Sequence, residues 1–142
     1  LELLRNFPEL FENVSQVVKY KTESFFSRET PEPDWALVAC EALPDSRNKN
    51  YSQQHMVLKQ YVQLHRTNEL RVGRRKLVEA LYDLILMNII GQKPMLHKKV
   101  DMTDSKFGTQ NFICINFGEK GIRINDISQQ QSHPQLGICP SW

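Results

Sequence analysis

The chain has 142 residues, of which 40% are hydrophobic and 24% charged, and 18 Lys and Arg against 16 Asp and Glu give a net charge of +2. These values are typical of a globular protein and exclude a disordered, collagen-like or coiled-coil chain. The longest nearly apolar run, residues 84–90, is far shorter than the roughly 20 residues of a membrane-spanning helix, so no membrane span is predicted. We expect one α+β domain over residues 1–127 and a polar tail over 128–142.

Three helices are predicted in the first half of the chain. Apolar residues at steps of three and four, beginning at Phe7, predict a helix from about residue 8 to about residue 27. Residues 30–34 are of the types that begin helices, and they predict a second, short helix over 35–43. Asn50 and Gln53 have the spacing of a capping box, which predicts a third helix over 51–65.

A fourth helix, over about 73–90 with Gly91 as its C-cap, is predicted to be the centre of the domain. Between residues 77 and 90 the plainly polar residues are Glu79, Asp83 and Asn88. A helix so apolar must be covered on most of its sides. The predicted fold class is therefore α+β, mostly helical, with about four helices packed around this central helix.

The last third of the sequence changes its period from helix to strand. Residues 112–117 are rich in β-forming types, residues 118–121 contain two glycines, and residues 122–125 alternate again. We expect a C-terminal β-hairpin over about 111–126. Because an isolated hairpin is only marginally stable, it must pack on the helices or gain a third strand, for which 95–100 is the nearest candidate.

Charge is unevenly distributed along the chain. Residues 1–45 carry a net charge of −5, residues 46–106 carry +7, and the remainder is neutral. A cluster of cations over 66–76 lies at the start of the fourth helix, where the helix dipole favours acids over bases. This placement suits a bound phosphate or carboxylate. The alternative is that the acids of the first segment neutralise the cluster internally; these acids are Glu9, Glu12, Glu23 and Glu29.

We define the predicted basic patch as the cations of this cluster, those that follow the helix, and those near the hairpin tip. They are the candidate anion- or partner-binding residues: Arg66, Arg71, Arg74, Arg75, Lys76, Lys98, Lys99, Lys120 and Arg123.

No catalytic or metal-binding signature is found in the sequence. It has no glycine-rich phosphate loop, no nucleophile elbow and no HExxH motif, and its four histidines are widely spaced. We therefore predict a non-enzyme with no cofactor and no metal site. The cysteines, Cys40, Cys114 and Cys139, cannot all pair within one chain and lack zinc-ligand spacing. Their number favours an intracellular protein, nuclear or cytoplasmic, over a secreted one.

We expect a non-catalytic protein-interaction module of a larger intracellular protein or assembly, since the chain also lacks an initiator Met. Its basic patch would dock an acidic protein segment, and an apolar surface near the N-terminal helix or the hairpin edge would add contact area. A homo-oligomer is not indicated. The alternative is nucleic-acid binding, because helices followed by a hairpin resemble the outline of winged-helix proteins, whose hairpin contacts the nucleic-acid backbone.

Overall fold

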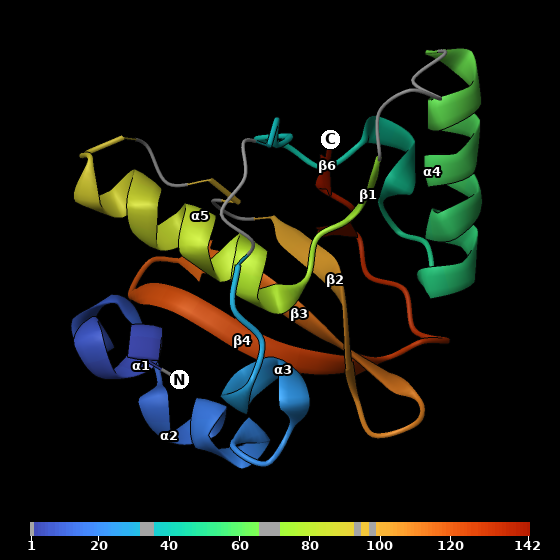
Figure 1. Cartoon of the computed structure of the whole chain (residues 1–142). Helices are drawn as coiled ribbons and strands as arrows, with labels where there is room; N and C mark the ends of the chain where they lie inside the picture. The colour runs from blue at the N-terminus through green and yellow to red at the C-terminus, as the bar shows by residue number, and fades with distance from the viewer. Residues whose placement is uncertain (1, 32–35, 66–71, 93–94, 97–98) are drawn as a thin grey trace.

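The structure is a computed structural model that describes residues 2–31, 36–65, 72–92, 95–96 and 99–142. In these residues, four strands form a sheet in the order β4–β3–β2–β5, and the helix α5 (Leu77–Ile89) lies across one face of it (Figure 1). The strands are β2 (Val100–Phe107), β3 (Asn111–Gly118), β4 (Gly121–Ser128) and β5 (Leu136–Gly137). Neighbouring strands are antiparallel, except that β5 runs parallel to β2.

The main core lies between α5 and the sheet. Ile113 and Ile115 of β3 and Ile122 and Ile124 of β4 face α5 and are buried with its inner side chains. The intervening residues of the strands point to the other face of the sheet, as the period of two requires. There Met102, Phe112, Cys114 and Leu136 form a second, smaller apolar cluster.

The predicted hairpin corresponds to β3 and β4, which are joined by a two-residue turn between Gly118 and Gly121. Gly121 has φ +122°, a conformation that favours glycine. A Cβ atom at this position would lie only 2.4 Å from the carbonyl oxygen of Leu10. The N-terminal segment therefore approaches the hairpin through a space that only glycine leaves open, and here the backbone N–H of Glu12 donates to the carbonyl of Ile122.

Two long helices lie close to the expected ranges. The helix α4 (Tyr51–Leu64) begins at the Asn50–Gln53 capping box, with both reciprocal hydrogen bonds made. The helix α5 ends at residue 89, and Gly91 follows in the left-handed conformation with φ +68°. The start of α5 differs from the prediction, because Gly73 and Arg74 form the strand β1 (Gly73–Arg74), which pairs with β6 (Pro140–Ser141).

The prediction of a mostly helical fold with four packed helices is wrong. The expected helix over 8–27 is replaced by short turns, because Asn13 caps a new turn at Gln16 and Phe11 bridges to Ile122 of β4. The apolar residues do recur at steps of three and four, but they belong to several short elements that pack on the sheet. These elements are α1 (Glu2–Asn6), η1 (Pro8–Leu10), α2 (Val14–Val17), η2 (Val18–Tyr20) and α3 (Ser24–Ser27).

The described part of the expected helix over 35–43 is not helical; Trp35 lies outside the described residues. Residues 36–43 run alongside the C-terminal segment instead, with hydrogen bonds from the Ala39 N–H to the Pro140 carbonyl and from the Leu43 N–H to the Ile138 carbonyl. A short 3-10 helix, η3 (Pro44–Ser46), follows. Pairing across about a hundred residues has overridden a local helix-start pattern.

Residues 128–142 do not leave the domain as a tail. They contribute β5 and β6, and Leu136, Ile138 and Cys139 are buried. The third strand of the hairpin is β2, not the expected 95–100. The buried polar residues of β2, which are Asp101, Thr103 and Ser105, have hydrogen-bond partners inside the protein. For example, the Thr103 hydroxyl donates to the Ile113 carbonyl at 2.8 Å. Among the described helices, none has the length and apolar character to cross a membrane.

We predict that Gly121→Ala lowers the free energy of unfolding by roughly 2–4 kcal/mol, because the added methyl group collides with the Leu10 carbonyl. Gly108→Ala is the control, since Gly108 has φ +64° but open space around it. Its cost is the left-handed backbone alone, about 1 kcal/mol. Urea unfolding of both variants measures the difference, and equal losses would contradict the close approach.

Candidate functional site

The two central arginines of the predicted basic patch are bound by the protein itself. Arg74 is partly buried, and its Nη1 donates to the Met102 carbonyl at 2.9 Å and to Gln54 Oε1 at 3.1 Å. Its Nη2 donates to the Tyr51 carbonyl, and its guanidinium lies 4.2 Å from the centroid of the Tyr51 ring. Arg74 therefore links α4 to β2.

Arg75 is buried, with 1% of its surface exposed. Its Nη1 donates to Asp83 Oδ2 at 2.9 Å and its Nη2 to Asp101 Oδ2 at 2.8 Å, while Asp101 Oδ1 accepts the backbone N–H of Cys139 at 2.9 Å. Burial by itself lowers the pKa of Arg75, but the carboxylates of Asp101 and Asp83 outweigh it and raise that pKa. We call Arg75, Asp83 and Asp101 the Arg75 cluster; its cation is closed to an external anion.

The other described members of the predicted basic patch do not converge on one surface. Lys99 pairs with Glu41 at 2.6 Å, and Arg123 at the hairpin pairs with Glu12. Lys76 is exposed at the start of α5, and Lys120 is exposed at the hairpin tip. The alternative, in which Glu9, Glu12, Glu23 and Glu29 neutralise the cluster over 66–76, is not seen for Arg74 and Arg75, which have other partners. Of those four acids, Glu12 pairs with a cation outside the cluster, Arg123. Three members lie outside the described residues: Arg66, Arg71 and Lys98.

A groove of about 540 Å³ opens between α1, α3 and the first half of α5. Its walls are mainly apolar, and its charged groups, such as Glu2, Arg28 and Glu29, come from α1 and from the segment after α3. The apolar residues that line it are Leu3, Phe25, Phe26, Pro31, Leu77, Val78, Leu81, Tyr82 and Ile124. Such a composition suits an apolar group with polar contacts at its edge.

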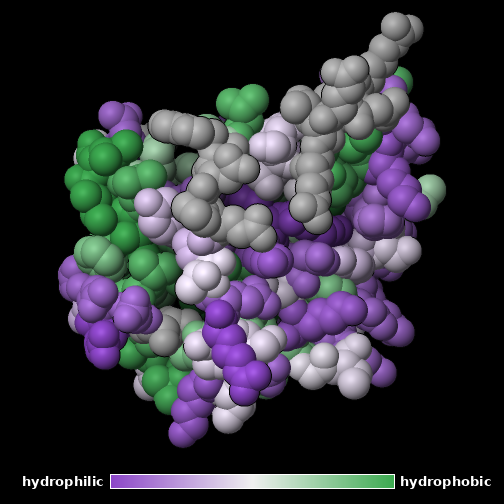
Figure 2. Space-filling model, viewed as in Figure 1, coloured by the Kyte–Doolittle hydropathy of each residue, from purple (hydrophilic) through white to green (hydrophobic). Residues whose placement is uncertain are grey.

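An exposed apolar row on α5 continues the groove. Tyr82, Leu86 and Ile89 of α5 and its C-cap residue Ile90, which we call the α5 stripe, are between 41% and 58% exposed. Their spacing puts them on one face of the helix, and Tyr82 also lines the groove. Figure 2 shows hydrophobic side chains gathered over the C-terminal half of α5. The groove and the α5 stripe are thus one continuous apolar surface.

Glu29, which is half-buried as a residue, has a buried side-chain oxygen at this surface. Its Oε2 is buried and has no hydrogen-bond partner among the described residues. The side chain lines the groove, beside the aromatic rings of α3. Buried polar atoms are nearly always bonded. Among the described residues the Nε atoms of Arg47, Arg74 and Arg75 are also buried without a partner, but of these four atoms Glu29 Oε2 is the acceptor and belongs to a residue that lines the groove.

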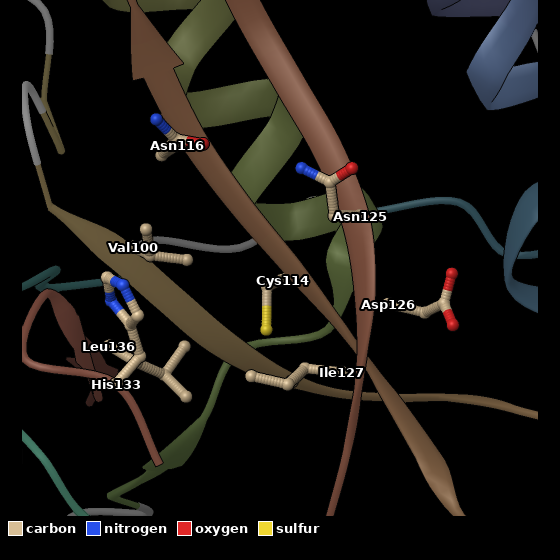
Figure 3. A pocket seen from close by; sticks show the side chains of 8 residues that line it. All are labelled: Val100, Cys114, Asn116, Asn125, Asp126, Ile127, His133 and Leu136. Carbon is tan, nitrogen blue, oxygen red and sulfur yellow. The ribbon is translucent and has the colours of Figure 1, made fainter. Parts of the chain in front are cut away.

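A smaller pocket of about 170 Å³ lies on the sheet face away from α5 (Figure 3). Burial raises the pKa of the Cys114 thiol, which keeps it protonated and unreactive. His133 accepts the backbone N–H of Gln135 through Nδ1, and the Asp126 carboxylate is held by other side chains. The remaining lining residues are Val100, Asn116, Asn125, Ile127 and Leu136. The described residues also contain no group of His, Cys, Asp and Glu that could hold a metal ion.

The groove was not predicted from the sequence, although one feature of the sequence indicated it. The near-continuous apolar run of α5 implied that the helix is covered on most sides. In the structure the sheet covers its inner side, whereas the α5 stripe is open among the described residues. The excess of apolar residues in the sequence thus corresponds to side chains that are partly exposed in the described structure.

No family model, curated protein or solved structure matches the chain.

We predict that Asp101→Asn lowers the free energy of unfolding by about 3 kcal/mol, because it leaves the buried Arg75 charge with one carboxylate and disturbs the Cys139 contact. Asp45→Asn is the matched control, since Asp45 is exposed; its effect stays within about 0.5 kcal/mol. Chemical unfolding at neutral pH measures both changes. Similar values for the two variants would show that the Arg75 cluster does not hold the fold together.

A pH dependence follows from Asp126. Partial burial disfavours its charge, but hydrogen bonds from Lys19, Tyr20 and Asn111 outweigh burial and lower its pKa. The stability that the charged Asp126 side chain contributes is therefore fully present above the pKa of the unfolded state, about 3.9. It is lost as the pH falls through the lower pKa of the folded state. We expect the difference in unfolding free energy between wild type and Asp126→Asn to be constant above about pH 5 and to shrink below pH 4. A difference that grows on acidification would contradict this assignment.

Proposed function

We propose that the protein is a non-catalytic protein-interaction module that docks its partner on the groove and the α5 stripe. The observation that carries the proposal is the continuity of the two: Tyr82 belongs to both, and Leu86 and Ile89 extend the apolar row by two further turns. Single exposed apolar side chains are ordinary, but a contiguous apolar surface with a polar edge marks an interaction site.

The energetics of α5 support this proposal. Its inner residues are buried against the sheet, so the helix is already held in place without the α5 stripe. Burying the exposed half of each side chain of the α5 stripe makes association more favourable by roughly 1 kcal/mol per residue. The helix thus offers a rigid apolar row that costs no reordering of its backbone on binding.

The proposed surface differs from the one expected from the sequence. Docking an acidic segment on the basic patch would need free cations, but Arg74, Arg75, Lys99 and Arg123 bind groups of the protein itself. The same engagement weighs against the nucleic-acid alternative, which no contact of the described residues favours. An apolar surface near the N-terminal helices, expected as an accessory, becomes the main contact.

The test is affinity capture from an extract of the source cells with three purified baits. The wild type should retain a defined partner, and Leu86→Asp/Ile89→Asp should lose at least 90% of it because two carboxylates would be buried in the interface. The matched control, Met56→Asp/Leu64→Asp, places the same charges on exposed apolar residues of α4 and should retain the partner. Circular dichroism must first show that all three baits are folded.

Direct titration of the captured partner completes the test. We expect its binding to the wild type to show a negative heat-capacity change in calorimetry, the sign of apolar burial. Identical capture by all three baits, or no specific capture by the wild type, would overturn the proposal.

A further inference from the structure

The unbonded Glu29 oxygen indicates the chemistry of the partner. A carboxylate oxygen shielded from water loses hydration, and a positively charged donor is the group that best replaces it. Glu29 Oε2 has no such donor among the described residues, and no described ion pair joins Arg28 to it. Glu2 adds a second carboxylate to the lining of the groove. The groove is thus complementary to a cation at its edge and to an apolar group inside.

We propose that the occupant of the groove is a basic amphipathic segment of another protein, with a Lys or Arg that bonds Glu29 Oε2 and an apolar side chain that packs on Phe25, Phe26 and Leu81. This inference rests on the proposed function and names the class of partner for the same surface. It reverses the charge expected from the sequence, which predicted an acidic partner for a basic patch.

The length of the surface favours a protein segment over a small amine. The α5 stripe runs from Tyr82 to Ile90, which at 1.5 Å per residue spans about 12 Å beyond the groove. A small molecule that fills the groove leaves Leu86 and Ile89 in water, whereas a helix laid along α5 covers them and the groove together. Helices dock in grooves by anchors at steps of three and four, the same steps that separate the residues of the α5 stripe.

The probe for the test is a phage-displayed library of 16-residue amphipathic helices with randomised positions on the apolar face and its flanks. It is selected in parallel on the wild type, Glu29→Gln, Glu29→Lys and Leu86→Asp/Ile89→Asp. Glu9→Gln is the matched control, because Glu9 is an exposed acid of the same N-terminal region and does not line the groove. Thermal unfolding confirms that each variant is folded before selection.

We expect wild type and Glu9→Gln to select peptides with Lys or Arg at one fixed position beside the apolar anchors. Glu29→Gln should lose this bias, and Glu29→Lys should select Asp or Glu there. A selected basic peptide measured by fluorescence anisotropy should bind Glu29→Gln at least about tenfold more weakly than the wild type. Replacing its Lys with norleucine should remove that difference.

The other outcomes separate this inference from the proposed function. Apolar peptides that bind the wild type and fail on Leu86→Asp/Ile89→Asp, but carry no basic bias, would overturn the cation at Glu29 and leave the interaction surface standing. Selection of no peptide that depends on Leu86 and Ile89 would overturn both.

Discussion

The rest of the structure depends on the buried pairing of Arg75 with Asp83 and Asp101. Arg75 immediately follows β1, Asp83 lies in the middle of α5, and Asp101 lies in β2 and also holds the backbone of Cys139. One guanidinium therefore connects the start of α5, its middle, the sheet and the C-terminal segment. Replacing all members of such a cluster by apolar residues need not lower stability. Removing one partner is costly, because it leaves a buried charge unpaired. The cluster therefore disfavours any packing of α5, β2 and the C-terminal segment in which these three side chains do not meet.

The same pairing fixes the rotation of α5 about its axis. Asp83 must face Arg75, and the Leu77 N–H must reach the hydroxyl of Ser105 in β2, where it donates at 2.9 Å. With the helix held at these two points, Leu84 and Ile85 turn toward the sheet and Leu86 and Ile89 turn outward. The direction in which the α5 stripe points is thus set by charged groups that take no part in it.

What could be predicted from the sequence is what depends on neighbours along the chain. The Asn50 capping box, the two glycines of the hairpin turn and the left-handed Gly91 are local signals, and each lies where the pattern placed it. The N-terminal turns and the segment over 36–43 depend on partners about a hundred residues away, as between Val38 and Ser141, which no local pattern contains. The polar strand β2 was missed for the same reason, because its buried hydroxyls have partners only in the folded sheet.

The ion-pair partners of the charged residues could likewise not be predicted from the sequence. The cations over 74–76 formed a clear cluster in the sequence, but their partners, such as Asp101, could be assigned only from the fold. In the alternative interpretation, Glu29 was one of four acids that would neutralise that cluster; in the structure it lines the groove, and its Oε2 has no hydrogen-bond partner among the described residues. The sequence showed that α5 has more apolar residues than one buried face needs. The structure shows which of them are exposed among the described residues.

The pairing of β6 with β1 and of β5 with β2 has a consequence for biosynthesis. Domains generally fold as units while the ribosome extends the chain from its N-terminus. Here β1 cannot pair with β6, and β2 cannot pair with β5, until residues 136–141 have emerged from the exit tunnel. The same holds for the hydrogen bond from the Cys139 N–H to Asp101. During translation, α5 is therefore synthesised before the contacts that anchor it to the sheet and to the C-terminal segment are complete.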